Sequence, residues 1–158
     1  MNTLTPYLTT LSNAPLLVGC YISFLQDDFK TFWCLIGTLF GSASSHLLEN
    51  ELSHHPTDFL IQTYRVLNGI DIVGACCSFL RISSLFWNKF GSYSYRRLFG
   101  IFSLGAGALV CALIDYYVKY LHQSRFTNRF VFNKVEYIIA HSFWHLYIQT
   151  AIILVLMP

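Results

Sequence analysis

Apolar stretches long enough to cross a lipid bilayer recur along the whole chain, and they constrain its fold more than any other feature. A membrane-spanning helix needs about 20 mostly apolar residues, so the chain has room for about five of them. We place these spans at 15–25 (with a start as early as Tyr7), 29–48, 67–85, 98–117 and 135–156. The sequence therefore predicts an all-α, multi-pass transmembrane helical bundle of about five spans.

Composition supports an integral membrane protein. The chain has 158 residues, of which 54% are hydrophobic and only 11% are charged, whereas soluble domains carry about 25% charged residues. A soluble chain of this length could not bury so much apolar surface. Because the apolar segments are spread over the whole sequence, we expect residues 1–158 to form a single transmembrane domain.

Charge and cysteine usage exclude several other classes. The net charge is only +2 and the basic residues are scattered, so nothing suggests a nucleic-acid partner. All five cysteines lie in apolar stretches and none forms a Cys-x-x-Cys pair, so we expect neither disulfides nor a cysteine metal site. The N-terminus lacks a basic region, which argues against a cleaved signal peptide.

The connections between the spans are expected to be polar. We predict a loop over 49–58, a partly interfacial lead-in over 59–66, a loop over 87–97 and a basic connection over 119–134. Basic residues occur on both sides of the bundle in similar number, so the distribution of Lys and Arg does not choose an orientation in the membrane.

Among the ionisable side chains of the expected spans we single out four: His46, Asp71, His141 and His145. Such residues are costly in lipid and usually serve a function. Asp115 and Glu136 lie near span ends, where interfacial water can solvate a charge. His46 lies near the end of the second span and Asp71 near the start of the third. These two positions face the same side of the membrane, because successive spans run in opposite directions. The histidine pair lies in the first half of the fifth span, one helical turn apart on one face. All four are therefore expected in the same half of the bilayer.

This set of residues predicts a metal centre. Three neutral imidazoles with one open position form a common catalytic zinc arrangement, and zinc lowers the pKa of a bound water toward about 7. Asp71 could then accept a proton from that water or orient a ligand histidine. Ser42 lies one turn before His46, where its hydroxyl could bind the water or stabilise an oxyanion.

Simpler interpretations exist for the same residues. The histidines could be packing or hydrogen-bonding residues without a metal. Ser42 could bond to its own helix backbone, as serines in membrane spans commonly do. Asp71 could be the ion-pair partner of Arg65 or Arg81.

The order of these residues resembles the signature of the CREST superfamily. The pattern is Ser42-Ala-Ser-Ser-His46, then Asp71 in the next span, then His141-Ser-Phe-Trp-His145 in the last span. This resemblance implies a helical membrane bundle in which the three histidines hold zinc, with Ser42 and Asp71 beside the zinc-bound water. Many members of the superfamily are lipid amidases or esterases.

Two details refine the resemblance. The segment from His141 to the terminal Met-Pro is most similar to the post-GPI-attachment phospholipase and myomaker group. The alkaline ceramidases typically carry a Trp-Cys-Glu motif, whereas Trp33-Cys34 is followed here by Leu35.

The number of spans departs from the pattern of the superfamily, whose core usually has seven, whereas about five are expected here. Loss of two adjacent spans after the Asp71 helix would preserve the alternation of direction that brings the site residues together.

The function expected from the resemblance is zinc-dependent hydrolysis of an amide or ester bond in a membrane lipid. The alternative is a receptor, fusogen or scaffold in which zinc has a structural or vestigial role. The sequence leaves open whether the chain is an enzyme, and it identifies neither the lipid, the organelle nor a protein partner.

Overall fold

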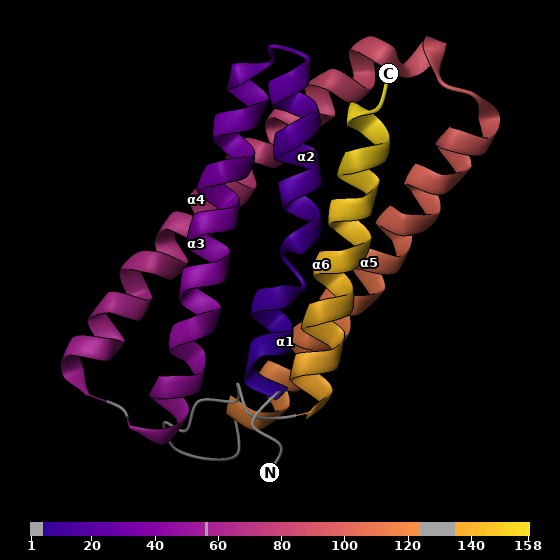
Figure 1. Ribbon diagram of the computed structural model, residues 1–158. Helices are drawn as coiled ribbons and strands as arrows, with labels where there is room; N and C mark the ends of the chain where they lie inside the picture. The colour runs from indigo at the N-terminus through magenta and orange to yellow at the C-terminus, as the bar shows by residue number, and fades with distance from the viewer. Residues whose placement is uncertain (1–4, 56, 124–134) are drawn as a thin grey trace.

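The computed structural model describes residues 5–55, 57–123 and 135–158, without the side chains at 5–6, 50, 53–54 and 119–123. In the described part every regular element is a helix. The helices are α1 (Thr5–Leu11), α2 (Ala14–Leu25), α3 (Phe29–His54), α4 (Asp58–Lys89), the short 3-10 helix η1 (Phe90–Ser92), α5 (Tyr95–Gln123) and α6 (Val135–Leu156). They form an elongated all-α bundle, in which α1 and the C-terminal end of α6 lie at opposite ends (Figure 1). The predicted fold class is confirmed.

The first predicted span is a broken helix. Pro15 in the first turn of α2 has no N–H and clashes with a helical carbonyl one turn earlier, so a helix cannot continue through it. Ser12 Oγ and Asn13 Nδ2 both donate to the carbonyl of Thr9, at 2.7 and 3.2 Å. These bonds close the end of α1 inside the bundle, where Asn13 is only 1% exposed.

Helices occupy more of the segment between the second and third spans than expected. The loop over 49–58 does not begin at Glu49, because α3 continues to His54. Residues 59–66, the expected lead-in, are helical and continuous with the expected span over 67–85, since α4 is one helix of 32 residues from Asp58 to Lys89. Thr57 caps α4 by accepting a hydrogen bond from the backbone N–H of Leu60. Both helices are therefore longer than their apolar segments.

The later connections are also shorter than expected. The loop over 87–97 reduces to η1 and a few flanking residues, because α4 ends at Lys89 and α5 begins at Tyr95. The first part of the basic connection is helical, since α5 reaches Gln123. The rest of that connection, 124–134, lies outside the described residues.

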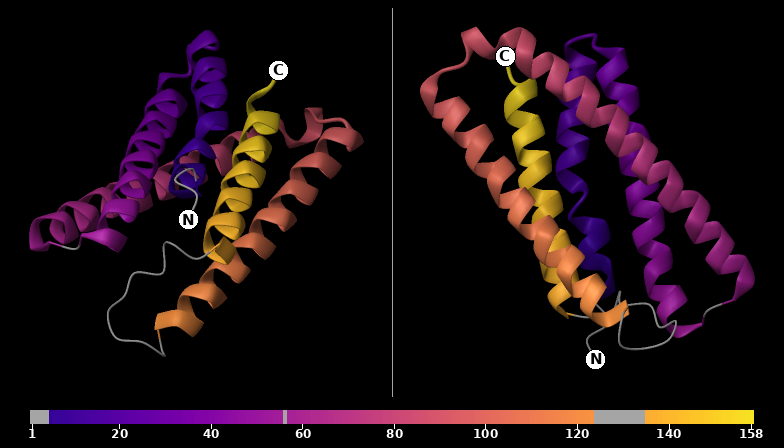
Figure 2. Two further views of the ribbon diagram at one scale, coloured as in Figure 1. Left: turned by 60° about the horizontal axis from the view of Figure 1, so that its bottom comes forward. Right: turned by 180° about the vertical axis from the view of Figure 1, so that it is seen from behind.

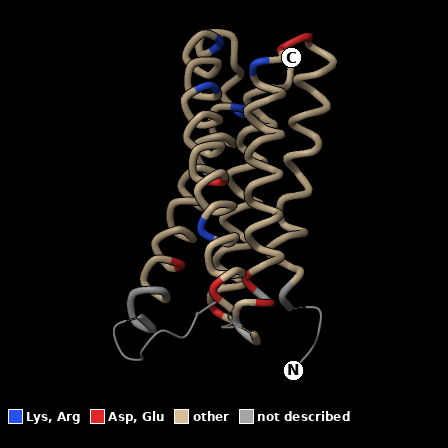
Figure 3. Tube along the Cα trace, turned by 90° about the vertical axis from the view of Figure 1, so that its left-hand side faces the viewer, with Lys and Arg blue, Asp and Glu red and all other residues tan. Residues whose placement is uncertain are grey.

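Four of the expected spans are long and apolar enough to cross a membrane: Tyr7–Leu25, Asp58–Ser92, Tyr95–Val118 and Val135–Leu156. The expected span over 29–48 falls in α3, which is not among these four. Its second half carries several serines, His46 and two glutamates, which lower its hydropathy. Most of the charged residues in the described part lie toward the two ends of the bundle (Figure 3), as expected of an integral membrane protein.

The bundle is built from two helix pairs. α3 packs along α4, and α5 packs along α6, with α2 between the pairs (Figures 1 and 2). Seen from behind, α4 and α5 diverge from η1, which joins them (Figure 2). A buried apolar cluster ties the pairs together near this end: Leu16, Cys20, Leu35, Ile82, Val155 and Leu156.

Side chains from neighbouring segments satisfy the carbonyls at the C-terminal end of α6. Gln26 Nε2 donates to the carbonyl of Leu156 at 2.9 Å, and Tyr93 Oη donates to that of Val155 at 3.1 Å. Arg97 Nε donates to the carbonyl of Leu154 at 2.7 Å. Since the last carbonyls of a helix have no partner within it, these bonds fix the axial position of α6, and with it the histidine pair.

Candidate metal centre

Three histidine side chains converge inside the bundle, as the alternation of spans predicted. His46 comes from α3, and His141 and His145 lie one turn apart on α6. Their Nε2 atoms are 3.1 Å apart for His46 and His141, 3.2 Å for His46 and His145, and 3.0 Å for His141 and His145. All three residues are buried, with between 3 and 7% of their surface exposed.

These three contacts cannot all be hydrogen bonds. The Nε2 atom of a neutral imidazole either carries a proton and donates, or has a lone pair and accepts. Among three nitrogens in mutual contact, at least two must have the same role, so at least one of the three contacts would be repulsive. A cation at the centre of the triangle removes the conflict, because all three lone pairs can then point to it.

The spacing also suits a metal ion. Three imidazole nitrogens bound tetrahedrally at about 2.0–2.1 Å from one ion are separated by about 3.3–3.4 Å. The observed separations of 3.0–3.2 Å are only slightly shorter. The buried triad of His46, His141 and His145 could therefore hold one metal ion and leave one coordination position open.

Glu49 is the first outer partner of this triad, and sequence reasoning missed it by assigning it to a loop. It lies on α3, is 5% exposed, and accepts a hydrogen bond from Nδ1 of His46 at 2.9 Å. A proton on Nδ1 leaves the lone pair of the neutral ring on Nε2, as a metal ligand requires. The spacing of three residues could have revealed the contact, because such residues share a helix face.

Asp115 is the second outer partner and was also misread. We expected a carboxylate near a span end to be solvated, but Asp115 Oδ2 lies 3.5 Å from Nδ1 of His141, and its side chain is only 13% exposed. The two residues come from α5 and α6, so no local spacing in the sequence predicts the contact.

Gln149 is the third outer partner. Its Nε2 lies 3.1 Å from Nδ1 of His145 and donates to Oδ1 of Asn13 at 3.0 Å. Its Oε1 is buried with no hydrogen-bond partner among the described residues. With Nδ1 of His145 as the acceptor, the proton of the neutral ring lies on Nε2, so metal binding through Nε2 requires the Gln149 amide to turn and give up its bond to Asn13. Asn13, which lies in the break between α1 and α2, is in this way linked to the site through Gln149.

Ser42 lies one turn before His46 on α3 and is fully buried, with 0% exposure. Its hydroxyl oxygen has no hydrogen-bond partner among the described residues. The suggestion that Ser42 bonds to its own backbone is therefore wrong. A buried hydroxyl without a partner costs about 1–3 kcal/mol, and a water or substrate oxygen at the triad could satisfy it.

Asp71 comes from α4 and is half-buried. Its carboxylate lies close enough to His46 and Glu49 to interact with them electrostatically. It is not the partner of Arg81, because Arg81 Nη2 donates to both carboxylate oxygens of Asp28, at 2.9 and 2.8 Å. In the described part of the chain Asp71 has no hydrogen bond, so its oxygens can accept one from a small molecule.

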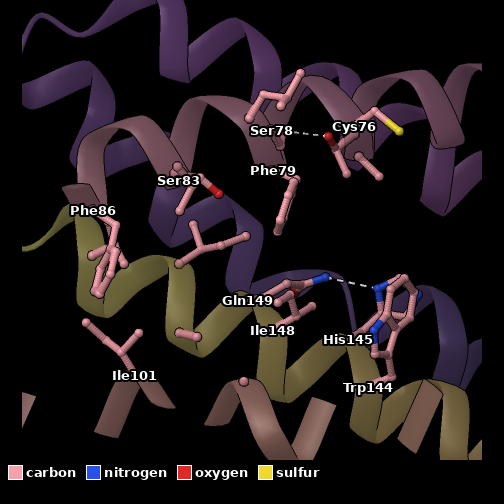
Figure 4. A pocket seen from close by; sticks show the side chains of 18 of the residues that line it. Cys76, Ser78, Phe79, Ser83, Phe86, Ile101, Trp144, His145, Ile148 and Gln149 are labelled. Atoms are coloured by element: carbon pink, nitrogen blue, oxygen red, sulfur yellow. Dashed lines mark hydrogen bonds between the residues drawn. The ribbon is translucent and has the colours of Figure 1, made fainter. Parts of the chain in front are cut away.

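A cavity of about 990 Å³ lies beside Asp71 and His145 and runs between α4, α5 and α6. Its polar end includes Asp71, His145 and Gln149, and Gln149 and His145 are seen beside Trp144 and Ile148 in Figure 4. Most of its other lining residues are apolar, among them Phe79, Phe86, Ile101, Phe102, Leu109 and Ile152. The cavity has a size typical of ligand sites.

Comparison with known proteins adds one relative of unknown activity. No family model matches the chain, and no solved structure matches it. The chain is similar to "Uncharacterized protein L282" of Acanthamoeba polyphaga mimivirus, with 28% identity over 141 residues that cover 87% of each protein. The similarity therefore extends over most of the helical bundle.

Proposed function

We propose that the chain is a zinc-dependent hydrolase that cleaves an amide or ester bond in a membrane lipid. The observation that carries this proposal is the buried triad, whose three Nε2 atoms lie within 3.2 Å of one another beside a cavity. The resemblance of Ser42-x3-His46, Asp71 and His141-x3-His145 to the CREST superfamily supports it.

Zinc is the metal that suits this donor set. Three neutral imidazoles with an open fourth position are typical of catalytic zinc sites. When bound, zinc would supply a Lewis acid that polarises a carbonyl and lowers the pKa of a water molecule. His46, His141 and His145 would hold it, with the Nδ1 atoms of these ligands facing Glu49, Asp115 and Gln149.

The other residues of the site have roles in the hydrolysis. Asp71 accepts the proton of the attacking water as the water oxygen bonds to the carbonyl carbon. The Ser42 hydroxyl donates a hydrogen bond to the oxygen on which negative charge develops. Asp71 then returns the proton to the leaving amine or alkoxide as the C–N or C–O bond breaks.

A lipid substrate is favoured by the surroundings of the site. The cavity joins Asp71 and His145 to a long apolar lining within the membrane-crossing helices. An acyl chain that enters the cavity from the bilayer would exchange its contacts with lipid tails for similar apolar contacts with Phe79, Phe102 and their neighbours. The polar end of the cavity would then receive the carbonyl group of the lipid.

The test is metal analysis of detergent-purified protein, followed by a screen of amide and ester lipids. We expect about one zinc per chain and a substrate whose turnover Asp71→Asn reduces by at least about 10²-fold without loss of zinc. Asp58→Asn, which removes an exposed carboxylate from the same helix, serves as the control. Protein without zinc would overturn the proposal. Zinc without turnover of any lipid would overturn the hydrolase and favour a structural metal in a receptor, fusogen or scaffold.

A further inference from the structure

The carboxylate of Glu49 is the centre of a buried polar network that joins three helices. His46 on its own helix donates to Oε2 at 2.9 Å. Tyr137 on α6 donates to Oε1 and Oε2, both at 3.2 Å. Tyr64 on α4 donates to Oε1 at 3.4 Å. A charged group this deeply buried is tolerated only with several hydrogen bonds, and the arrangement therefore fixes the position of both oxygens.

Tyr137 links this network to a second ligand histidine. Its side chain is 1% exposed, so it has little freedom to move. Its ring stacks on the ring of His141, with centroids 5.1 Å apart and an angle of 28° between the planes. One tyrosine thus contacts His141 through its ring and the partner of His46 through its hydroxyl. The orientations of ligands from α3 and α6 are coupled through it.

The three outer partners of the triad differ in strength. Glu49 is a carboxylate at hydrogen-bond distance from Nδ1 of His46, whereas Asp115 lies at 3.5 Å from His141 and Gln149 is a neutral amide. Hydrogen bonds to charged groups are about twice as strong as neutral ones. Among these three contacts, the one made by Glu49 is expected to contribute most to ligand orientation.

We propose that Glu49 is the positioning residue of the metal centre, which holds His46 with Nε2 facing the ion, and that Tyr64 and Tyr137 hold Glu49. This inference rests on the metal site of the proposed function. Glu49 acts through His46 and takes no part in the hydrolysis itself. Partners of this kind typically change metal affinity by 10- to 100-fold.

The experiment measures the affinity of the full-length, detergent-purified protein for Zn²⁺ by competition with a chelating dye. We expect Glu49→Ala to weaken binding by about 10- to 100-fold. Glu49→Gln keeps an oxygen acceptor for Nδ1–H and should recover part of that loss. Tyr137→Phe removes only a hydroxyl, so it should weaken binding less than Glu49→Ala. Glu51→Gln removes an exposed carboxylate two residues away and should bind zinc like the wild type.

Cobalt gives a second measurement that a general loss of stability would not alter. The visible absorption of bound Co²⁺ depends on the geometry of its ligands, so it should change in Glu49→Gln and Tyr137→Phe and stay unchanged in Glu51→Gln. Wild-type zinc affinity and an unaltered cobalt spectrum in Glu49→Gln and Tyr137→Phe would overturn this inference and leave the proposed function standing. A wild-type protein that binds no zinc would overturn both.

Discussion

A Cβ atom on Gly41 would lie 2.6 Å from the backbone nitrogen of Asp71 and 2.8 Å from its Cα atom. The backbones of α3 and α4 therefore touch at Gly41, immediately before Ser42 and directly at Asp71. A second close approach occurs where a Cβ on Gly74 would lie 2.9 Å from the backbone of Thr38. Small residues allow membrane helices to approach this closely. The contact sets the depth of Asp71 relative to Ser42 and His46.

Gly41→Ala should therefore destabilise the protein, because neither helix backbone can move away from the added methyl group without repacking. We expect a loss of about 1–3 kcal/mol in the free energy of unfolding, as for other overpacked sites. The measurement is unfolding in detergent, followed by circular dichroism. Turnover should fall as well, since Asp71 is displaced.

Gly37 on the same helix provides the matched control. A Cβ there meets nothing within 4 Å, and alanine has a higher helix propensity than glycine by about 1 kcal/mol. Gly37→Ala should therefore leave the protein as stable as the wild type or more so. Equal effects of the two substitutions would contradict the role given to the contact between Gly41 and Asp71.

The overall fold was predictable because hydropathy reports directly on which segments can lie in lipid. It could not give the true helix ends. Glu49 and Tyr64 read as polar residues outside a span, yet they lie on helices that continue beyond the apolar segments and bond to each other. The backbone continues to form hydrogen bonds wherever caps such as Thr57 allow it, and apolar content does not mark that limit.

The convergence of the three histidines was predicted from the sequence, but the residues that surround them were not. His141 and His145 share a helix face, and the alternation of spans brings His46 to the same depth. Asp115 reaches His141 only through the rotation and tilt of α5 against α6. Those angles follow from side-chain packing between helices, which the pattern along one chain does not encode. Gln149 instead lies one turn after His145 on the same helix, so the spacing of four residues could have revealed that contact.

Ser42→Ala should reduce turnover without reducing stability. The hydroxyl is buried with no hydrogen-bond partner among the described residues, so its removal takes away a desolvation penalty rather than a bond. We expect turnover of the lipid substrate to fall on the order of 10²-fold, with zinc content unchanged. A large fall in unfolding temperature would contradict this interpretation and indicate a structural bond from Ser42.

Removal of the metal should destabilise the bundle, because the ligands come from two helices that belong to different pairs. Adding a chelator should lower the unfolding temperature of the wild type by several degrees, and re-adding zinc should restore it. His141→Ala should unfold at the lower temperature and not respond to the chelator. His55→Ala changes an exposed histidine and should respond like the wild type. A chelator response that persists in His141→Ala would place the metal elsewhere.

Asp28 should make stability depend on pH in the acidic range. Partial burial raises the pKa of Asp28, but hydrogen bonds from Thr31 and from Arg81, with the charge of Arg81, outweigh this and hold the pKa below its usual value. The unfolded state therefore binds the proton more readily. The stabilisation is fully present above the unfolded pKa of about 3.9 and is lost as pH falls through the folded pKa.

The difference between the wild type and Asp28→Asn isolates this contribution from those of the other carboxylates. We expect the wild type to have the higher unfolding temperature at pH 5 to 6, and the difference to shrink as the pH is lowered below about 4. A difference that stays constant over this range would show that the Asp28 contacts do not depend on its charge.

Filling the cavity should separate substrate binding from metal binding. Gly105 on α5 lines the cavity, and a Cβ there meets nothing within 4 Å, so Gly105→Phe projects a ring into open space instead of into packed side chains. We expect kcat/KM for the lipid to fall by roughly tenfold or more with zinc content unchanged. Gly69→Phe on α4 is the control, because Gly69 has equal space but is not a lining residue. If both variants keep wild-type kcat/KM, the acyl chain does not lie in this cavity.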